Sequence, residues 1–510
     1  MIRYFSSFKK AKLTTPYSIY ILLSCLIKQG SSLITLLIFS AKKYSDAIAL
    51  TDENEVISYK ELSIQTKQLL YYLQNNHKLK QGNRVAIISK NHISCIKTIF
   101  ALSGLGADIY LLSTEITKDQ FDELEKSVSF DFIIYDVEKS LLLSNYKEKS
   151  LLAYGNYSVD SLSKNKVETK IKIKRIKHSR ITTLTSGSTG NFKLANRKTS
   201  IINYIYPFCD LFTKLTLGHY KSIFIATPIY HGFGLATFFI SYLLGSKIFL
   251  NSSFDQKKIS DTISKNHIEV LSLVPVMLHR IIKQNSDSLF SLKCIISGGS
   301  VLSHNIVQQV FDKLGFVLYN LYGTSENGIC TIATPADLHK YPGTIGKPIN
   351  GLQIKIKNNS QKHIGEIYTK NNWSIKKNNW IKSGDLGYKN IEGFYFLSGR
   401  TDDMIISGGI NVFPIELEMV LIQNHNIEQA YVIGIPDEDF GQRLKAYIQL
   451  IPDCKITQEE LFDWLAVKIP KYHKPKQIEF ITEIPYNAIG KIQKNKFVEK
   501  LKSGTLQLEV

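Results

Sequence analysis

A short polar loop at residues 185–193, reading TSGSTGNFK, holds residue types that bind phosphate. Its two glycines, Gly187 and Gly190, allow the backbone to turn without a side-chain penalty and bring N–H groups close to an anion. Four hydroxyl groups and one ammonium group add further donors, from Thr185, Ser186, Ser188, Thr189 and Lys193. Taken alone, the same string is also compatible with an ordinary turn, where Gly, Ser and Thr are common.

The spacing within this loop excludes the phosphate-binding loop of nucleoside triphosphatases. That motif has four residues between its glycines and a lysine directly after the second one. Here two residues separate Gly187 from Gly190, and Lys193 follows three positions later. The ligand of the loop must therefore be inferred from the rest of the chain.

The segments that position the loop alternate between short apolar runs and helical patterns. Strands are predicted at residues 48–51, 56–59, 84–89, 132–135, 222–227, 245–250, 270–273 and 294–297. Helices are predicted at residues 60–76 and 93–105. The alternation predicts an α/β fold with parallel-rich sheets and ligands at the carboxyl ends of the strands. The lysine-rich run at 164–177 alternates with Val and Ile and predicts a solvated strand face.

Length and a change of pattern predict several domains. A chain of 510 residues, 44% of them hydrophobic, exceeds the size of one ordinary core. Near residue 351 the strands become shorter and richer in turns, and a polar break at 399–403 precedes a compact α+β segment. We predict an amphipathic extension at 1–45, a large domain at 46–401 and a small mobile domain at 402–510, joined to it by a hinge.

Composition narrows the partners and the compartment. The net charge is +19, but the lysines are spread along the whole chain, which favours a general coding bias over nucleic-acid binding. The six cysteines include no C-x-x-C pair. This argues against a disulfide framework or a zinc site and favours a reducing, cytoplasmic compartment. Any metal should be bound by oxygen.

The first 45 residues leave two alternatives open. Arg3, Lys9, Lys10 and Lys12 precede two apolar stretches, at 19–27 and 33–39. Each stretch is too short to span a bilayer, which takes roughly 20 apolar residues. We predict one or two amphipathic helices that either pack on the protein or lie at the inner face of the membrane, with the basic residues toward lipid headgroups.

Six further motifs give the loop a chemical context. They read TPIYHGFG at 227–234, SGGSVL at 297–302, YGTSENG at 322–328, KSGDLGY at 382–388, GRTDDMIISGGINVFPIELE at 399–418 and PYNAIGKIQKNK at 485–496. In this order, together with TSGSTGNFK, they resemble the adenylate-forming (AMP-binding) enzyme superfamily. Its members include acyl-CoA synthetases, luciferases and the adenylation domains of peptide synthetases. The likeness covers roughly residues 46–497, and DMIISGGINVFP is most similar to fatty and medium-chain acyl-CoA ligases.

The resemblance implies an ATP and Mg²⁺ site. Lys491, Glu326 and Thr185 match the catalytic positions, and Glu326 and Thr185 match those that support the metal. The implied nucleotide-binding set is Ser186, Gly187, Ser188, Thr189, Gly190, Lys193, Gly298, Gly299, Ser300, Tyr322, Gly323, Thr324, Ser325, Asp385 and Arg400.

Without the resemblance, three of these residues would be assigned ordinary structural roles. Tyr322 would then be a core tyrosine, Arg400 a domain-interface ion pair and Lys491 a surface charge. The resemblance instead places Tyr322 on adenine and Arg400 on ribose or phosphate, and has Lys491 stabilise charge as the carboxylate attacks the α-phosphate. Asp385, a carboxylate on a tight loop, is itself suited to accept both ribose hydroxyls.

The resemblance also implies two half-reactions and a moving domain. A carboxylic acid and ATP give an acyl-adenylate and pyrophosphate, and a thiol then displaces AMP. His231 matches a position that gates the acyl and thiol pockets. Asp402 matches the hinge, and Gly408 and Gly409 match the turn that approaches the pantetheine of CoA.

The chain departs from the family pattern at a few positions, and three functions stay open. Phe192 stands where the family usually has Pro, Leu194 where it often has Gly, and Asn411 where some relatives have Arg. The leading hypothesis is a stand-alone ligase that joins a lipid-like carboxylic acid to CoA. The alternatives are transfer to the phosphopantetheine thiol of an acyl carrier protein, and a non-catalytic nucleotide-binding or membrane-docked homologue.

Overall fold

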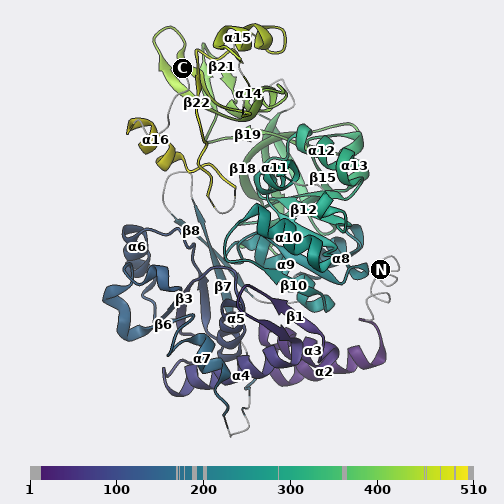
Figure 1. Ribbon diagram of the computed structural model, residues 1–510, viewed down its shortest axis with the longest axis vertical. Helices are drawn as coiled ribbons and strands as arrows, with labels where there is room; N and C mark the ends of the chain where they lie inside the picture. The colour runs from purple at the N-terminus through teal and green to yellow at the C-terminus, as the bar shows by residue number, and fades with distance from the viewer. Residues whose placement is uncertain are drawn as a thin grey trace.

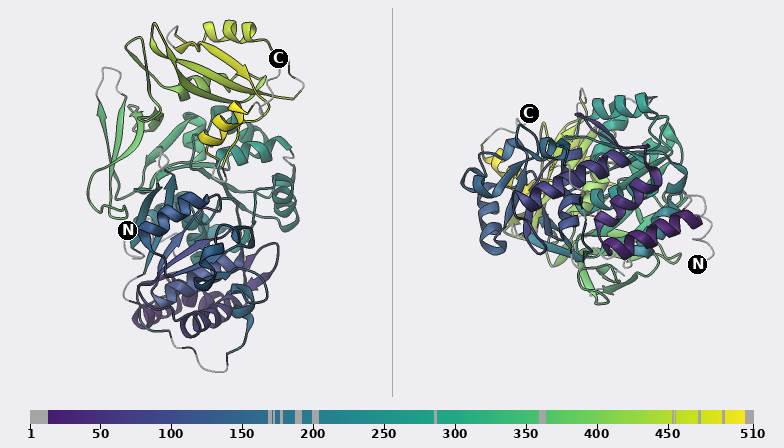
Figure 2. Two further views of the ribbon diagram at one scale, coloured as in Figure 1. Left: turned by 90° about the vertical axis from the view of Figure 1, so that its left-hand side faces the viewer. Right: turned by 90° about the horizontal axis from the view of Figure 1, so that it is seen from below.

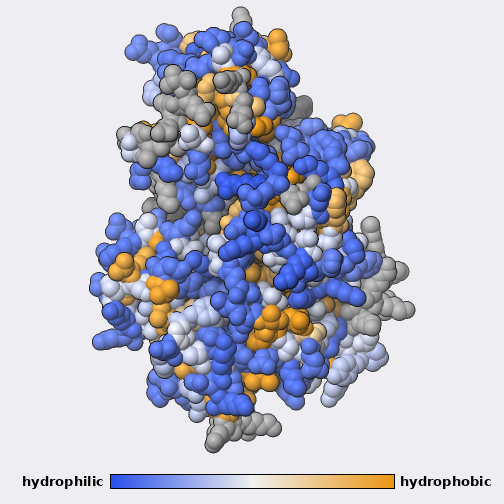
Figure 3. All heavy atoms as spheres, in the orientation of Figure 1, coloured by the Kyte–Doolittle hydropathy of each residue, from blue (hydrophilic) through white to orange (hydrophobic). Residues whose placement is uncertain are grey.

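The computed structural model describes residues 13–167, 171, 173–176, 179–186, 192–198, 204–284, 287–358, 364–452, 454, 456–470, 473–487 and 490–503. These residues form a large N-terminal domain of packed sheets and helices and a small C-terminal domain at one end of the long axis (Figure 1). The predicted α/β fold class is confirmed. The face drawn in Figure 3 is mostly hydrophilic, as the lysine-rich composition predicts.

The first sheet of the large domain is mainly parallel and carries the phosphate-loop strands at one edge. Its strand order is β6 (Ser150–Leu152), β5 (Phe132–Tyr135), β3 (Arg84–Ile88), β4 (Asp108–Leu111), β7 (Arg180–Ser186) and β8 (Phe192–Lys198). Only the β7–β8 pair among these is antiparallel. Its connecting helices include α4 (Tyr59–Asn75), α5 (Ile93–Leu105), α6 (Lys118–Val128) and α7 (Val159–Lys164). Helix α5 is buried along its whole length, including Lys97, whose ammonium group donates to Glu55 Oε1 over 2.7 Å.

The second sheet is longer and changes from parallel to antiparallel along its width. Its strand order is β16 (Gln353–Asn358), β17 (Gly365–Lys370), β18 (Ile381–Lys389), β19 (Tyr395–Arg400), β15 (Thr344–Pro348), β14 (Gly328–Ala333), β13 (Leu318–Thr324), β12 (Cys294–Gly298), β11 (Val270–Leu273), β9 (Ser222–Ile225), β10 (Lys247–Leu250), β1 (Ile48–Thr51) and β2 (Val56–Ser58). The run from β13 to β1 is parallel, and the pairs from β13 to β16 are antiparallel.

Helices and short 3-10 turns connect these strands. The helices are α8 (Ile205–Lys214), α9 (Gly232–Leu244), α10 (Gln256–Asn266), α11 (Pro275–Gln284), α12 (His304–Leu314) and α13 (Pro335–Lys340). The 3-10 turns are η1 (Val137–Lys139), η2 (Ser144–Lys149), η4 (Leu217–His219) and η5 (Asp287–Leu289). In the left view of Figure 2, the green strands of the antiparallel part of the second sheet project to one side of the molecule, away from the helices.

The two N-terminal helices differ in how much of their surface is buried. Helix α3 (Leu33–Tyr44) is part of the core, where Ile34 and Leu37 are fully buried. Helix α2 (Pro16–Gln29) buries one narrow stripe, including Ile21 and Cys25, and presents the rest to solvent. Among the described residues, no helix has both the length and the apolar character needed to cross a membrane.

The C-terminal domain is a small α+β unit around an antiparallel ribbon. Its elements are β20 (Ile405–Ser407), β21 (Ile410–Val412), α14 (Pro414–Leu421), β22 (Ile427–Asp437), β23 (Gly441–Leu450), α15 (Gln458–Ala466), β24 (Gln477–Phe480) and α16 (Lys494–Lys502). Strands β22 and β23 pair over most of their length and share a core with α14 and α15. The boundaries predicted at 45/46 and 401/402 stay predictions.

One prediction about secondary structure is wrong. In the lysine-rich run at 164–177, the described residues form no strand, and α7 ends at Lys164. A hydrogen bond ties the run to the end of α2, where the Ile176 N–H donates to the Gln29 carbonyl over 2.9 Å. Ile176 is buried while Lys174 and Arg175 point to solvent, which accounts for the alternation that suggested a strand.

Candidate active site

A buried carboxylate, Asp385, lies at the centre of the predicted nucleotide site. Strands β18 and β19 place it directly opposite Arg400, whose guanidinium donates to Asp385 Oδ1 over 2.9 Å. The Tyr322 hydroxyl, from β13, donates to Asp385 Oδ2 over 2.6 Å. Burial raises the pKa of Asp385, while Tyr322, Arg400 and Lys491 act in the opposite direction. Burial and then Asp385 raise the pKa of Tyr322 well above its ordinary value.

Lys491 is carried by a tight hairpin of the C-terminal domain. The backbone N–H of Lys491 donates to Asn487 Oδ1 over 2.9 Å, and Tyr486 pairs with Ile492 across the turn. Gly490 has φ of 68°, in the left-handed region, and a Cβ there would lie 2.7 Å from Val276 Cγ1 and 2.8 Å from Val274 Cγ2. The hairpin therefore packs directly on the large domain, and only glycine fits at its tip.

The Lys491 ammonium group lies among charged residues of the large domain. The pKa of Lys491 is lowered, first by removal from bulk water and then by Arg400, while Asp385 and Glu326 act to raise it. Lys491 nevertheless remains exposed to solvent. Two cations and two carboxylates thus converge from both domains, so the site offers cationic groups for phosphate oxygens and carboxylate oxygens for hydroxyl groups or a metal ion.

His231 borders the same group of residues. It is the N-cap residue of α9, its ring lies 4.6 Å from that of Tyr230, and its side chain makes no capping hydrogen bond. Burial, and then the nearby charge of Lys491, lower the pKa of His231 to about 3. The imidazole is therefore neutral at physiological pH, next to an ammonium group and aromatic rings.

Glu326 lies on the turn between β13 and β14 and is partly exposed. Its carbonyl accepts from the Ile375 N–H over 3.0 Å, and Thr324 Oγ1 accepts from the Asn327 N–H over 3.1 Å, so the turn is fixed at both ends. The Glu326 carboxylate influences the pKa values of both Asp385 and Lys491 and so faces the same site. A single exposed carboxylate suits Mg²⁺, which keeps several waters and takes few protein ligands.

Several predicted glycines lie where backbone segments meet closely. A Cβ on Gly298, at the end of β12, would lie 2.8 Å from the Leu321 carbonyl oxygen and 3.5 Å from Phe233 Cζ. A Cβ on Gly323 would lie 2.4 Å from the Gly328 carbonyl oxygen. Gly299 has φ of 91°, and Ser300 follows it at the surface of this edge. These positions leave flat backbone beside Tyr322.

The phosphate loop is described only in part. Thr185 and Ser186 end β7, and Lys193 lies in β8, where it is paired with Thr185. The side chains of these three residues, and all of Gly187, Ser188, Thr189 and Gly190, lie outside the described part of the chain.

The predicted CoA-side glycines are not at the Lys491 site. Gly408 and Gly409 form the β20–β21 turn with φ of 54° and 79°. The Gly408 N–H donates to the Phe440 carbonyl within the C-terminal domain over 2.9 Å. Asp402 lies between the domains, 3.8 Å from an Arg400 nitrogen.

Sequence reasoning missed the contacts that hold the two domains together. Val274 and Val276 receive the lysine hairpin, and Gln493 Nε2 donates to Glu115 Oε1 over 3.4 Å. Val274 follows β11 directly. Since ligands bind at the carboxyl ends of parallel strands, this position could have indicated that Val274 lies near the site. No pattern in the sequence pairs Gln493 with Glu115.

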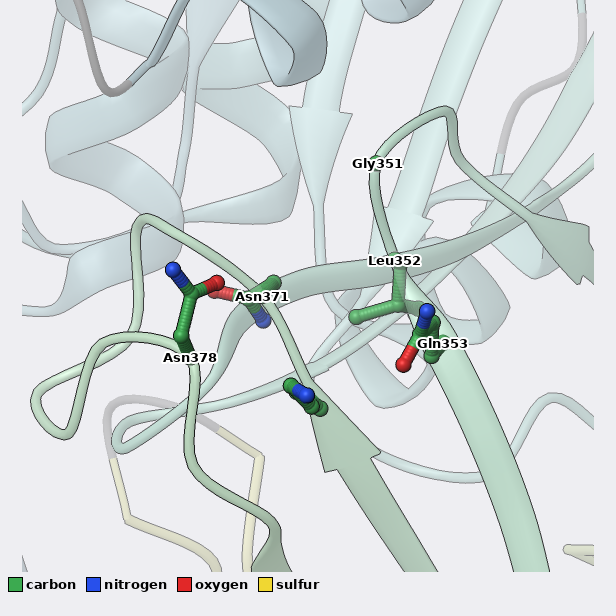
Figure 4. A pocket seen from close by; sticks show the side chains of 6 residues that line it. Gly351, Leu352, Gln353, Asn371 and Asn378 are labelled. Carbon is green, nitrogen blue, oxygen red and sulfur yellow. The ribbon is translucent and has the colours of Figure 1, made fainter.

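A polar pocket of about 600 Å³ lies elsewhere, between the β15–β16 connection and the end of β17 (Figure 4). It is lined by Gly351, Leu352, Gln353, Lys370, Asn371 and Asn378. None of the predicted site residues lines it.

Comparison with known proteins decides the family. The model of the AMP-binding enzyme family matches residues 39–377, and that of the AMP-binding enzyme C-terminal domain matches residues 416–491. The chain belongs to the AMP-binding enzymes. The matched ranges contain Tyr322, Glu326 and Lys491.

Curated relatives of this AMP-binding enzyme include acid–CoA ligases. It is 27% identical over 479 residues to 2-succinylbenzoate–CoA ligase of Bacillus pumilus, covering 89% of this chain and 95% of the relative. It is 30% identical to the enzyme of the same name from Oceanobacillus iheyensis, covering 81% and 88%.

Solved structures agree with this placement. The o-succinylbenzoate CoA synthetase of Bacillus subtilis, bound to its acyl-adenylate intermediate, superposes with a TM-score of 0.80 at 25% identity, covering 91% of this chain and 97% of that one. ATP-bound MatB from Rhodopseudomonas palustris superposes with a TM-score of 0.81 at 22% identity, covering 92% and 99%, and shows the shared fold. The protein is an AMP-forming acid–thiol ligase that joins an acid to CoA through an acyl-adenylate.

Proposed function

We propose that this ligase activates an aromatic carboxylic acid of the 2-succinylbenzoate type and transfers it to CoA, with MgATP as the co-substrate. The observation that carries the proposal is the convergence of Lys491, Asp385, Arg400, Glu326 and His231 from two domains.

Each residue has a role that its surroundings support. Lys491 would stabilise the charge that develops when the carboxylate attacks the α-phosphate. Asp385, fixed by two donors, would accept the ribose hydroxyls, and Tyr322 would offer its ring face to adenine. Gly298, Gly299 and Ser300 would lie along the adenine edge. Glu326, together with Thr185, would hold Mg²⁺, which would screen the phosphate charge.

The acid side of the proposal rests on the residues around His231. The Tyr230 ring lies against the neutral His231 imidazole, and Phe233 approaches Gly298 beside the end of β12. Aromatic side chains beside His231, which lies near Lys491, suit a planar acid whose carboxylate points to the ammonium group. The curated relatives named above carry the name 2-succinylbenzoate–CoA ligase rather than a fatty-acid name. A fatty acid is the competing substrate class.

The second half-reaction would require the C-terminal domain to rotate. In the present arrangement the Lys491 hairpin contacts the large domain, while Gly408 packs beside Phe440 within the C-terminal domain. Rotation about Asp402 would withdraw Lys491 and bring the β20–β21 turn toward CoA.

The test is a panel of acids assayed for acid-dependent pyrophosphate release, with mass spectrometry of the CoA product. The panel contains 2-succinylbenzoate, benzoate, malonate and fatty acids of increasing chain length. The proposal predicts the highest kcat/KM with 2-succinylbenzoate and a matching CoA thioester. A preference for fatty acids would overturn the substrate class. Adenylate formation without a CoA thioester would instead indicate a carrier protein as the acceptor.

A further inference from the structure

Helix α2 presents an apolar face to solvent. The exposed fractions are 62% for Tyr17, 70% for Tyr20, 54% for Leu23 and 70% for Ile27. Spacings of three and four residues place Tyr20, Leu23 and Ile27 in one stripe, opposite the buried Ile21 and Cys25. Ile19 and Leu22 flank the stripe and are also exposed. A helix that packs on the core with one face normally turns polar residues outward, and α2 does not.

Basic residues accompany this apolar face, and Lys28, near the end of α2, is exposed. Residues 1–45 contain seven basic residues and no Asp or Glu, the bases being Arg3, Lys9, Lys10, Lys12, Lys28, Lys42 and Lys43. Lys28 and Lys42 are exposed and lie close enough to Cys25, on the packed side of α2, to act on its thiol pKa, lowering it against a larger rise caused by burial.

The segment that crosses the end of α2 adds to the same charge. Ile176 donates its N–H to Gln29, and the neighbouring Lys174 and Arg175 are exposed. Apolar and aromatic side chains framed by lysines form the pattern of a helix that lies in the interface of an anionic bilayer. Tyrosine is enriched at that depth of the membrane.

We propose that α2 docks this ligase on an anionic lipid bilayer, with Tyr20, Leu23 and Ile27 inserted among the headgroups and acyl chain ends. The charge decides between lipid and a second copy of the chain. Two copies meeting through α2 would bring two basic rims together, whereas anionic headgroups neutralise them.

The position of α2 is compatible with catalysis at the membrane. Figure 1 shows α2 at the opposite end of the long axis from the C-terminal domain. The view from below in Figure 2 shows the purple helices α2 and α3 lying across that end of the molecule. Docking there leaves the C-terminal domain and its Lys491 hairpin facing water, free to rotate.

The test is flotation of the full-length protein with vesicles of phosphatidylcholine alone and of phosphatidylcholine with 30 mol% phosphatidylglycerol. The proposal predicts binding to the anionic vesicles that weakens with added salt. The triple variant Tyr20→Ser, Leu23→Ser, Ile27→Ser should lose at least about tenfold in affinity. The matched control, Leu141→Ser, Ile391→Ser, Val467→Ser, changes three other exposed apolar residues and should bind as the wild type does.

Acid-dependent pyrophosphate release, expected to be unchanged in both triple variants, shows that they are folded. A second variant, Lys28→Gln with Lys42→Gln, keeps the apolar face and should reduce binding to anionic vesicles. Absence of wild-type binding, or binding that the α2 triple variant does not weaken, would overturn the proposal. So would a wild-type dimer that the α2 variant dissociates without any vesicle binding, because the face would then be an interface between copies. Flotation needs neither ATP nor an acid, so its result is independent of the substrate proposal.

Discussion

The ionisation states of two side chains follow from their surroundings. His231 has a pKa lowered to about 3 by burial and by Lys491, so its imidazole carries no charge across the usual assay range. We therefore expect His231→Asn, a neutral polar replacement, to raise the KM for the acid by about tenfold without altering the pH profile. Steady-state kinetics from pH 5.5 to 8 measure both effects. A limb near pH 6.5 in the wild type that disappears in the variant would contradict the neutral state.

Lys491 should control the alkaline side of the pH profile. Its pKa is lowered from 10.5 by burial and by Arg400, so the ammonium group is present below this lowered pKa and is lost as pH rises through it. We expect kcat/KM for ATP, which reports the free enzyme, to decline at a pH below that of an ordinary lysine. Lys491→Arg should move this decline upward, because the guanidinium does not deprotonate. An alkaline limb unchanged by Lys491→Arg would assign it to another group.

The position of the hairpin that carries Lys491 depends on the absence of a side chain at Gly490. In Gly490→Ala, the new methyl group would meet Val274 and Val276 at less than van der Waals distance, so the hairpin must shift. A displacement of about 1 Å at a catalytic group can cost 100-fold, and we expect a loss of that order in pyrophosphate release.

The matched control for this prediction is Gly315→Ala. Gly315 also has a positive φ, of 76°, but nothing lies within 4 Å of its added Cβ. It should therefore cost stability alone, seen as a lower melting temperature with little change in kcat. Equal activity losses in the two variants would mean that backbone strain, and not contact with the large domain, explains the effect.

Secondary structure was predictable where local signals agree. The predicted ranges match α5, β5 and β11, because each apolar run is bounded by a clear stop, such as Gly106 in the left-handed region after α5. The alternation in the run at 164–177 led to a wrong strand prediction. It reflects contacts with distant segments, since Ile176 is buried against the end of α2. Local periodicity does not distinguish a strand from an extended segment held by its neighbours.

The motifs supply a set of candidate site residues but not their geometry, and the roles of these residues stay predictions. Family motifs identified Asp385, Arg400 and Tyr322, and the structure joins them by hydrogen bonds. The motifs carried no information on which surface receives Gly490 or on the charge state of His231. Both depend on packing between segments more than 200 residues apart.

In the proposed mechanism, the relative position of the two domains determines which half-reaction can take place. Gln493 and Glu115 face each other across the domain interface in the present arrangement. We expect Gln493→Cys with Glu115→Cys, bridged by a short bis-maleimide, to retain adenylate formation and lose CoA thioester formation, because Lys491 stays in place and the β20–β21 turn cannot approach. Quenched-flow measurement of each half-reaction tests this. Each single cysteine variant, treated with the same reagent, is the control, and equal loss of both half-reactions would contradict a required rotation.

In the proposed mechanism, a lysine from the small domain drives chemistry on a nucleotide bound by the large one. Acid-dependent pyrophosphate release by Lys491→Ala, compared with Lys468→Ala, tests this, because Lys468 is an exposed lysine of the same domain. We expect a loss of about 100- to 1,000-fold for Lys491→Ala, wild-type activity for Lys468→Ala, and retained transfer from supplied acyl-adenylate to CoA in both. Pyrophosphate release by Lys491→Ala at the wild-type rate would contradict it.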